Sequence, residues 1–165
     1  MNLEFLINKD PYSLNKFEKT NILNDYFYNL TKYHYDNCKN YQRILNSIDY
    51  EINIKQDYSD IPFLPVKLFK MFDMISVPNN NIVKTITSSG TSGQGVSKIF
   101  LDKQTAFNQS KILVKIISSY TGSKRLPMII IDSPSVTKNR TMFSARGAGI
   151  IGFSIFGSKK TYALK

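Results

Sequence analysis

The chain has 165 residues, with 22 Lys and Arg against 12 Asp and Glu, which gives a formal net charge of +10 and a pI near 9.6. This length fits one domain, and the content of 42% hydrophobic and 13% aromatic residues excludes an intrinsically disordered chain. The single cysteine, Cys38, excludes an internal disulfide framework.

The distribution of charged and apolar residues indicates where the protein acts and which partners it can bind. Glu4, Lys9 and Asp10 interrupt the first residues, so a signal peptide is not expected. The longest apolar runs, such as residues 128–131, are far shorter than the roughly 20 residues that cross a bilayer. Lys and Arg are scattered rather than gathered in a stripe, which favours a solvated surface over a nucleic-acid site. We expect a cytoplasmic protein with no membrane span and no nucleic-acid partner.

The first half of the sequence predicts helices. Apolar residues recur at helical spacing over residues 14–30, and a second helix is expected from Thr31 to about Leu45. Pro62 and Pro65 then predict an extended segment that leads into a short helix around residues 66–69.

A proline followed by three asparagines, residues 78–81, predicts a loop between two parts of the single domain 1–165. Residues 1–77 form the helical part and residues 82–165 the strand-rich part. In the second part, β-branched alternation predicts a strand over 82–87, and a further strand is expected over 97–101.

Asp102 is a good N-cap for a helix that reaches about Tyr120, with Gly122 as its stop. Residues 128–131 predict a buried strand that ends at Asp132, and small and apolar residues predict a helix within 143–156. The fold class is therefore α/β, with N-terminal helices followed by a mixed sheet and packed helices.

The loop at residues 88–95 is the most informative segment. Its glycines let backbone N–H groups turn inward, and its hydroxyls add donors, so it can wrap a polyphosphate. Val96 and Ser97 stand where a Walker-A loop requires Lys and then Ser or Thr, which argues against that motif. From composition alone, a flexible hairpin connection explains the loop equally well.

Six residues of this loop resemble the phosphate loop of adenylate-forming enzymes: Ser88, Ser89, Gly90, Thr91, Ser92 and Gly93. Three further blocks, residues 61–70, 97–102 and 143–153, narrow the resemblance to the LuxE-type acyl-protein synthetases. The resemblance spans nearly the whole chain and implies part of the large domain of an adenylate-forming enzyme.

The resemblance implies an activity. In that family a carboxylic acid, typically a fatty acid, is activated with ATP and Mg²⁺ to an acyl-adenylate, pyrophosphate leaves, and the acyl group passes to a cysteine thiol for delivery to a partner reductase. The six loop residues would hold the ATP phosphates. The family's acyl-accepting cysteine lies towards the C-terminus, so Cys38 is not that residue.

The adenine- and ribose-binding segments of such enzymes would lie beyond Lys165, so we expect an N-terminal portion that is inactive by itself. The alternative is a truncated, non-catalytic remnant that binds only a nucleotide or a partner polypeptide. The pattern identifies no catalytic residue and no metal ligand.

Five other residues are candidates for a functional site. Lys98 follows the loop later than the family's lysine does, so a role as a plain strand residue competes with phosphate binding. His34 and Cys38 stand four apart on a helix, but two ligands do not close a zinc site, which favours packing. Asp132 is followed by Ser133 and Pro134, so a role in a turn is favoured over a role as a carboxylate ligand of magnesium. For Arg146, an ordinary solvent-facing position on a helix is favoured over contact with a bound anion.

Overall fold

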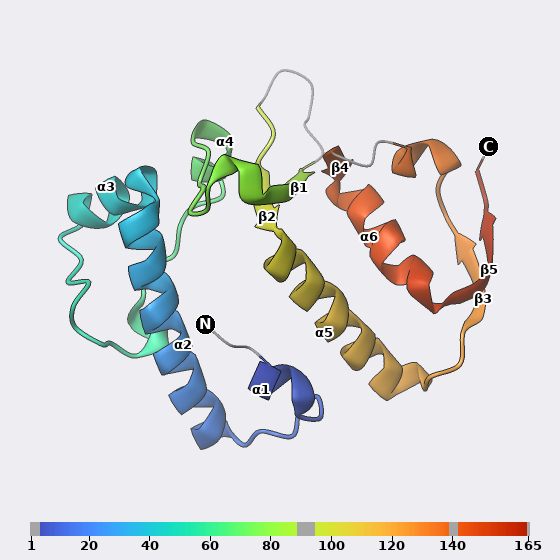
Figure 1. The fold of residues 1–165 in the computed structure, drawn as a ribbon, viewed down its shortest axis with the longest axis horizontal. Helices are drawn as coiled ribbons and strands as arrows, with labels where there is room; N and C mark the ends of the chain where they lie inside the picture. Colours follow the sequence, from blue (N-terminus) through green and yellow to red (C-terminus); the bar gives the residue numbers. More distant parts are fainter. Residues whose placement is uncertain (1–3, 89–94, 139–141, 165) are drawn as a thin grey trace.

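A computed structural model describes residues 4–88, 95–138 and 142–164. Helices α2 (Lys16–Asn37) and α3 (Lys39–Ser47) lie on one side of the molecule, and the short helix α1 (Glu4–Asn8) lies between α2 and α5 (Lys103–Thr121) (Figure 1). A long irregular segment, with the short helix α4 (Leu68–Met71), leads to the strands at the centre. All strands among the described residues lie after residue 81, and the mixed class α/β is confirmed.

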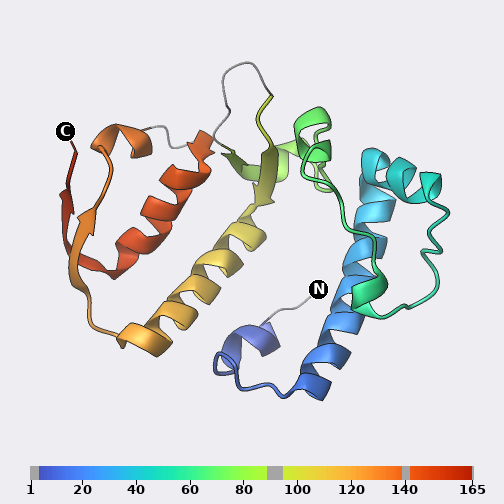
Figure 2. The same ribbon diagram turned by 180° about the vertical axis from the view of Figure 1, so that it is seen from behind.

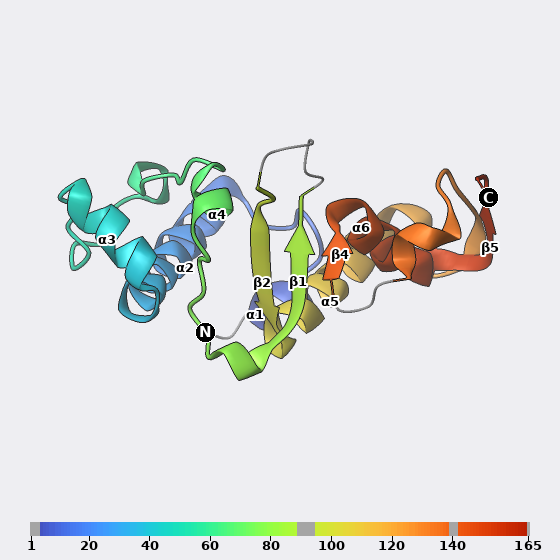
Figure 3. The same cartoon turned by 90° about the horizontal axis from the view of Figure 1, so that it is seen from above.

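Two small sheets are formed. In the first, β1 (Ile82–Thr87) pairs antiparallel with β2 (Lys98–Asp102) and parallel with β4 (Met142–Ser144). In the second, β3 (Leu126–Ile130) pairs parallel with β5 (Gly157–Tyr162). Viewed from above, β2, β1 and β4 stand side by side, with α2 and α3 beyond one edge and the second sheet beyond the other (Figure 3).

Two helices pack on these strands. Helix α5 (Lys103–Thr121) follows β2 directly and contacts β1 and β2. Helix α6 (Ala145–Phe153) follows β4 directly and contacts β1 and β4. Figure 2 shows α5 running from the first sheet towards the segment that leads to β3, with α1 beside it, and α1 contacts α5.

The ends of the long helices follow local chemistry. Asn15 and Glu18 form a capping box at the start of α2, in which each side chain accepts a hydrogen bond from the other residue's backbone N–H. Asp102 caps α5 by accepting from Thr105 N at 2.7 Å. Gly122 ends α5 with φ +72°, a conformation that favours glycine. The predicted cap and stop of α5 are confirmed.

Two expectations were wrong. The predicted break between the first helices at Leu30 and Thr31 does not exist: α2 runs on to Asn37, and the chain turns at Cys38, which is extended (φ −126°, ψ 101°). Thr31 is instead a buried helical residue that packs inward. The strand predicted at residues 128–131 forms, but Ile129 is 75% exposed and Ile131 is 85% exposed, so only one face of this strand is covered.

Few of the described residues are fully buried, and they are spread over several helices and strands. Leu45, Cys38 and Thr31 are buried where α2 and α3 meet, while Leu101 and Ile130 are buried on the two sheets. No helix of the described residues is both long enough and apolar enough to cross a membrane.

Candidate functional site

The described part of the predicted phosphate loop is its base. Ser88 N donates to Ser97 O at 3.1 Å, and Ser97 N donates to Ser88 Oγ at 3.0 Å, so both ends of the loop are fastened to each other. Ser97 Oγ is buried without a hydrogen-bond partner among the described residues. Of the six predicted site residues only Ser88 is described. The other five lie outside the described residues: Ser89, Gly90, Thr91, Ser92 and Gly93.

An open pocket of about 630 Å³ adjoins the end of the loop at Gly95. Two exposed lysines of the segment around α4, Lys67 and Lys70, line this pocket together with Val66 and Met71. Two ammonium groups beside a loop rich in backbone and hydroxyl donors favour an anionic ligand.

Lys98 does not add to this positive charge in the same way. Its Nζ lies 3.2 Å from Asp73 Oδ1, and the residue begins β2. The interpretation of Lys98 as a strand residue is confirmed, and its charge is already paired.

Asp132 and Arg146 are 14 positions apart in the sequence and form an ion pair in the structure. Asp132 Oδ1 accepts from Ser133 N at 2.8 Å, which confirms its part in a turn, and Asp132 Oδ2 lies 2.8 Å from Arg146 Nε. Asp132 is only 8% exposed, whereas the Arg146 side chain is 72% exposed. Arg146 therefore faces solvent, as expected, but is also anchored by a carboxylate. No group of three or more potential metal ligands exists among the described side chains.

His34 and Cys38 are packing residues, as expected. Cys38 is buried, and His34 Nδ1 lies 2.6 Å from Ser76 Oγ. The imidazole also makes edge contacts with the rings of Tyr33 and Tyr41. Burial lowers the pKa of His34 below its ordinary value of 6.5.

This shift predicts a pH dependence of stability, since His34 is the only histidine of the chain. Below about pH 6.5 the unfolded chain binds a proton that the native imidazole resists, so the free energy of unfolding should fall as the pH drops through 6.5 and level off below the native pKa. Urea unfolding between pH 5 and 7.5 measures the slope. The variant His34→Gln should flatten it, and an unchanged slope in that variant would contradict the assignment.

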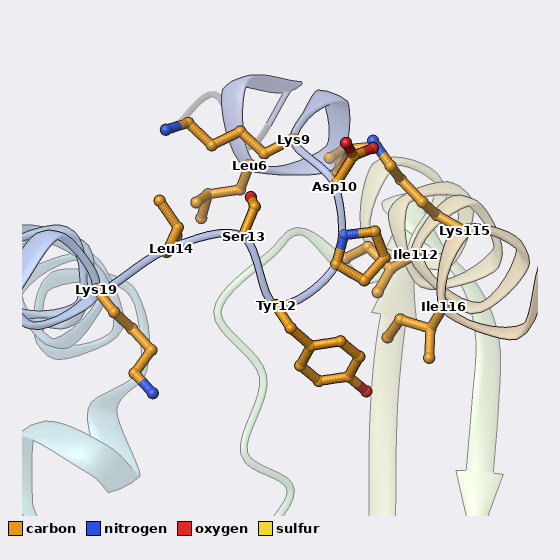
Figure 4. Close-up of a pocket in the computed structure, with 12 residues that line it drawn as sticks. Leu6, Lys9, Asp10, Tyr12, Ser13, Leu14, Lys19, Ile112, Lys115 and Ile116 are labelled. Carbon is orange, nitrogen blue, oxygen red and sulfur yellow. The ribbon is translucent and has the colours of Figure 1, made fainter. Parts of the chain in front are cut away.

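A second pocket, of about 420 Å³, lies between α1, the segment that joins α1 to α2, and α5. Figure 4 shows Ile112 and Ile116 of α5 on one side and Leu6 and Leu14 on the other. Tyr12, at its rim, has φ +66°, a strained conformation for a tyrosine. No single stretch of sequence signals this pocket, because its walls come from both ends of a span of about one hundred residues.

This apolar pocket is separate from the loop. Helix α1 and the middle of α5 lie away from the β1–β2 hairpin (Figure 2). Further groups that suit an anion lie beside the loop, at Lys67 and Lys70, and at the start of α6, at Arg146.

Comparison with known proteins gives the family. The family model for LuxE, described as acyl-protein synthetase, matches residues 2–165. Neither the curated proteins nor the solved structures contain a match to this chain. Since the family model covers essentially the whole chain, the protein belongs to the LuxE acyl-protein synthetase family.

Proposed function

We propose that this protein takes part in the ATP-dependent activation of a carboxylic acid, of the fatty-acid class, followed by transfer of the acyl group to a protein thiol. The carboxylate attacks the α-phosphorus of ATP, so that acyl-adenylate forms and pyrophosphate leaves. The thiol then attacks the acyl carbon and releases AMP. Membership of an acyl-protein synthetase family supports the general activity.

The proposal assigns the phosphates to Ser88, Ser89, Gly90, Thr91, Ser92 and Gly93. The observation that carries this assignment is the fastening of Ser88 to Ser97, because it fixes both ends of a donor-rich loop at the end of β1. The two lysines of the adjoining pocket, Lys67 and Lys70, supply positive charge next to that loop. Mg²⁺ would accompany the nucleotide and neutralise its phosphates.

We further propose that residues 1–165 act as one portion of an acyl-adenylating domain, with a helical part, 1–77, and a part that carries the phosphate loop, 82–165. The proposed partner is an acyl-reductase or an acyl-transfer protein that takes over the acyl group. The fold supports the division, because the described strands all lie in the second part.

Acid-dependent exchange of pyrophosphate into ATP tests the proposal in the full-length protein. Gly90→Val and Gly93→Val should reduce the exchange to background, because a branched side chain would fill the space that the phosphates need. Gly149→Ala is the matched control, since a Cβ at Gly149 meets no atom within 4 Å.

Retained exchange in both loop variants would reject the phosphate assignment. Absence of exchange in the unmodified protein, with retained binding of ATP, would instead favour the alternative of a non-catalytic nucleotide-binding protein.

A further inference from the structure

Two chain segments leave the first sheet side by side, at the edge formed by the carboxyl ends of its parallel strands. Strands β1 and β4 are parallel, and Thr87 is in register with Ser144. Both strands therefore end at the same edge, from which the predicted phosphate loop leaves β1 and helix α6 leaves β4 (Figure 3). Ligands of open α/β sheets bind at the carboxyl ends of parallel strands, where such segments leave the sheet.

Arg146 lies in the first turn of α6, directly after that edge. Ser144 fixes this turn, because its Oγ accepts from Gly147 N at 3.1 Å. Asp132 holds the Arg146 side chain, because Asp132 Oδ2 lies 2.8 Å from Arg146 Nε. Asp132 has little freedom, since its other oxygen accepts from Ser133 N and only 8% of the residue is exposed.

This arrangement leaves most of the guanidinium group in solution. A guanidinium carries five N–H donors in a rigid planar fork, and the ion pair uses the one on Nε. The side chain is 72% exposed, although its anchor is nearly buried. The contact to the nearly buried Asp132 therefore fixes the Nε side of the fork, while its other side faces solvent.

We propose that Arg146, oriented by Asp132, binds an oxyanion at the edge where the loop and α6 begin. Its two terminal nitrogens can grip two oxygens of one phosphate or carboxylate, the geometry in which arginine binds such groups most strongly. The oxyanion is a nucleotide phosphate or the carboxylate of the acid, which share this chemistry. The proposal rests on the proposed function. Asp132 is a positioning residue that does not touch the ligand.

Binding to simple probes tests this role without an activity assay. Phenylglyoxal modifies arginine side chains, and the rate at Arg146 can be followed by mass spectrometry of its peptide in the full-length protein. Inorganic tripolyphosphate should slow this rate if the oxyanion is a phosphate, and octanoate should slow it if the oxyanion is a carboxylate. A rate that neither probe changes would overturn the proposal.

Substitution gives a second measurement. Arg146→Lys keeps the charge but loses the fork, and together with Arg146→Met it should weaken the binding of the protecting probe, measured by calorimetry, about 10- to 100-fold. Lys159→Met, on the exposed part of β5, removes one positive charge elsewhere and should leave that affinity within about twofold. Equal losses in the Arg146 and Lys159 variants would show a general charge effect and overturn the proposal.

Asp132 is tested by coupling. Asp132→Asn should weaken probe binding less than Arg146→Met does, and in the double variant the two effects should not add, because both act through one guanidinium. In the exchange assay, the KM of the substrate whose probe gives protection should rise while the other KM stays unchanged. Thermal unfolding of each variant checks that a folded protein is compared. Additive losses would remove Asp132 from the proposal.

The two proposals fail differently. If the unmodified protein exchanges pyrophosphate and the Arg146 variants match it in exchange and in probe binding, this inference is wrong and the proposed function stands. If the unmodified protein shows no exchange, the proposed function fails, and the protection of Arg146 by the probes still decides whether an oxyanion binds there.

Discussion

Truncation of Leu45 to alanine is expected to lower the free energy of unfolding by about 2–5 kcal/mol. Leu45 is 0% exposed and lies on α3, which packs against α2. The loss combines the transfer free energy of the missing methyl and methylene groups with the cavity that they leave.

Urea unfolding measures this effect, and Ile48→Ala is the matched control. Ile48 caps the same helix but is 52% exposed, so its truncation should change the free energy of unfolding by no more than about 0.5 kcal/mol. Similar losses in both variants would mean that α3 is not packed on α2 as described.

Gly147→Ala and Gly149→Ala should have opposite effects, although both replace a glycine of α6. A Cβ at Gly147 would lie 2.7 Å from the backbone oxygen of Val136, so α6 would have to move away from the 3₁₀ turn Pro134–Thr137. Overpacking of this kind costs about 1–3 kcal/mol. A Cβ at Gly149 meets nothing within 4 Å, so alanine there should gain up to about 1 kcal/mol from helix propensity.

Thermal unfolding of the two variants gives the comparison. The Gly147 variant should also disturb the ion pair between Arg146 and Asp132, because the turn Pro134–Thr137 begins two residues after Asp132. Equal stability of the two variants would show that the close approach of α6 to Val136 is not maintained in solution.

The helices and strands with strong local signals could be predicted from the sequence. Helix α5 is the clearest example, because Asp102 caps its start and Gly122 terminates it. The β-branched run of β1 gave its full extent. In such places the local chemistry and the tertiary structure agree.

Other features depended on contacts that no local pattern contains. The turn at Cys38 has no proline or glycine to announce it, and its position is set by the packing of α3 on α2. Strand β5 has no apolar alternation and was not predicted, since its pairing with β3 decides it. The exposed Ile129 belongs to an apolar run that is typical of a buried strand, because sequence alone does not say whether both faces are covered.

The candidate site divides in the same way. The glycine- and hydroxyl-rich loop was visible in the sequence because its chemistry is local. The partnership of Asp132 with Arg146 was not visible, since it depends on the turn after Asp132 and on the start of α6. The sequence does not link Lys67 and Lys70 to the loop, because the pocket that they line with Gly95 is formed by segments about 25 residues apart in the chain.

The parallel pairing of β4 with β1 bears on the order in which the chain folds. The β1–β2 hairpin joins near neighbours in sequence, whereas the pair Thr87 and Ser144 closes a span of about 57 residues. Closing the longer span costs more conformational entropy than closing the hairpin. Strand β4 and helix α6 are therefore expected to dock after the hairpin has formed. During synthesis, β1, β2 and α5 also leave the ribosome first. The edge that holds Arg146 is then one of the last parts of the protein to be assembled.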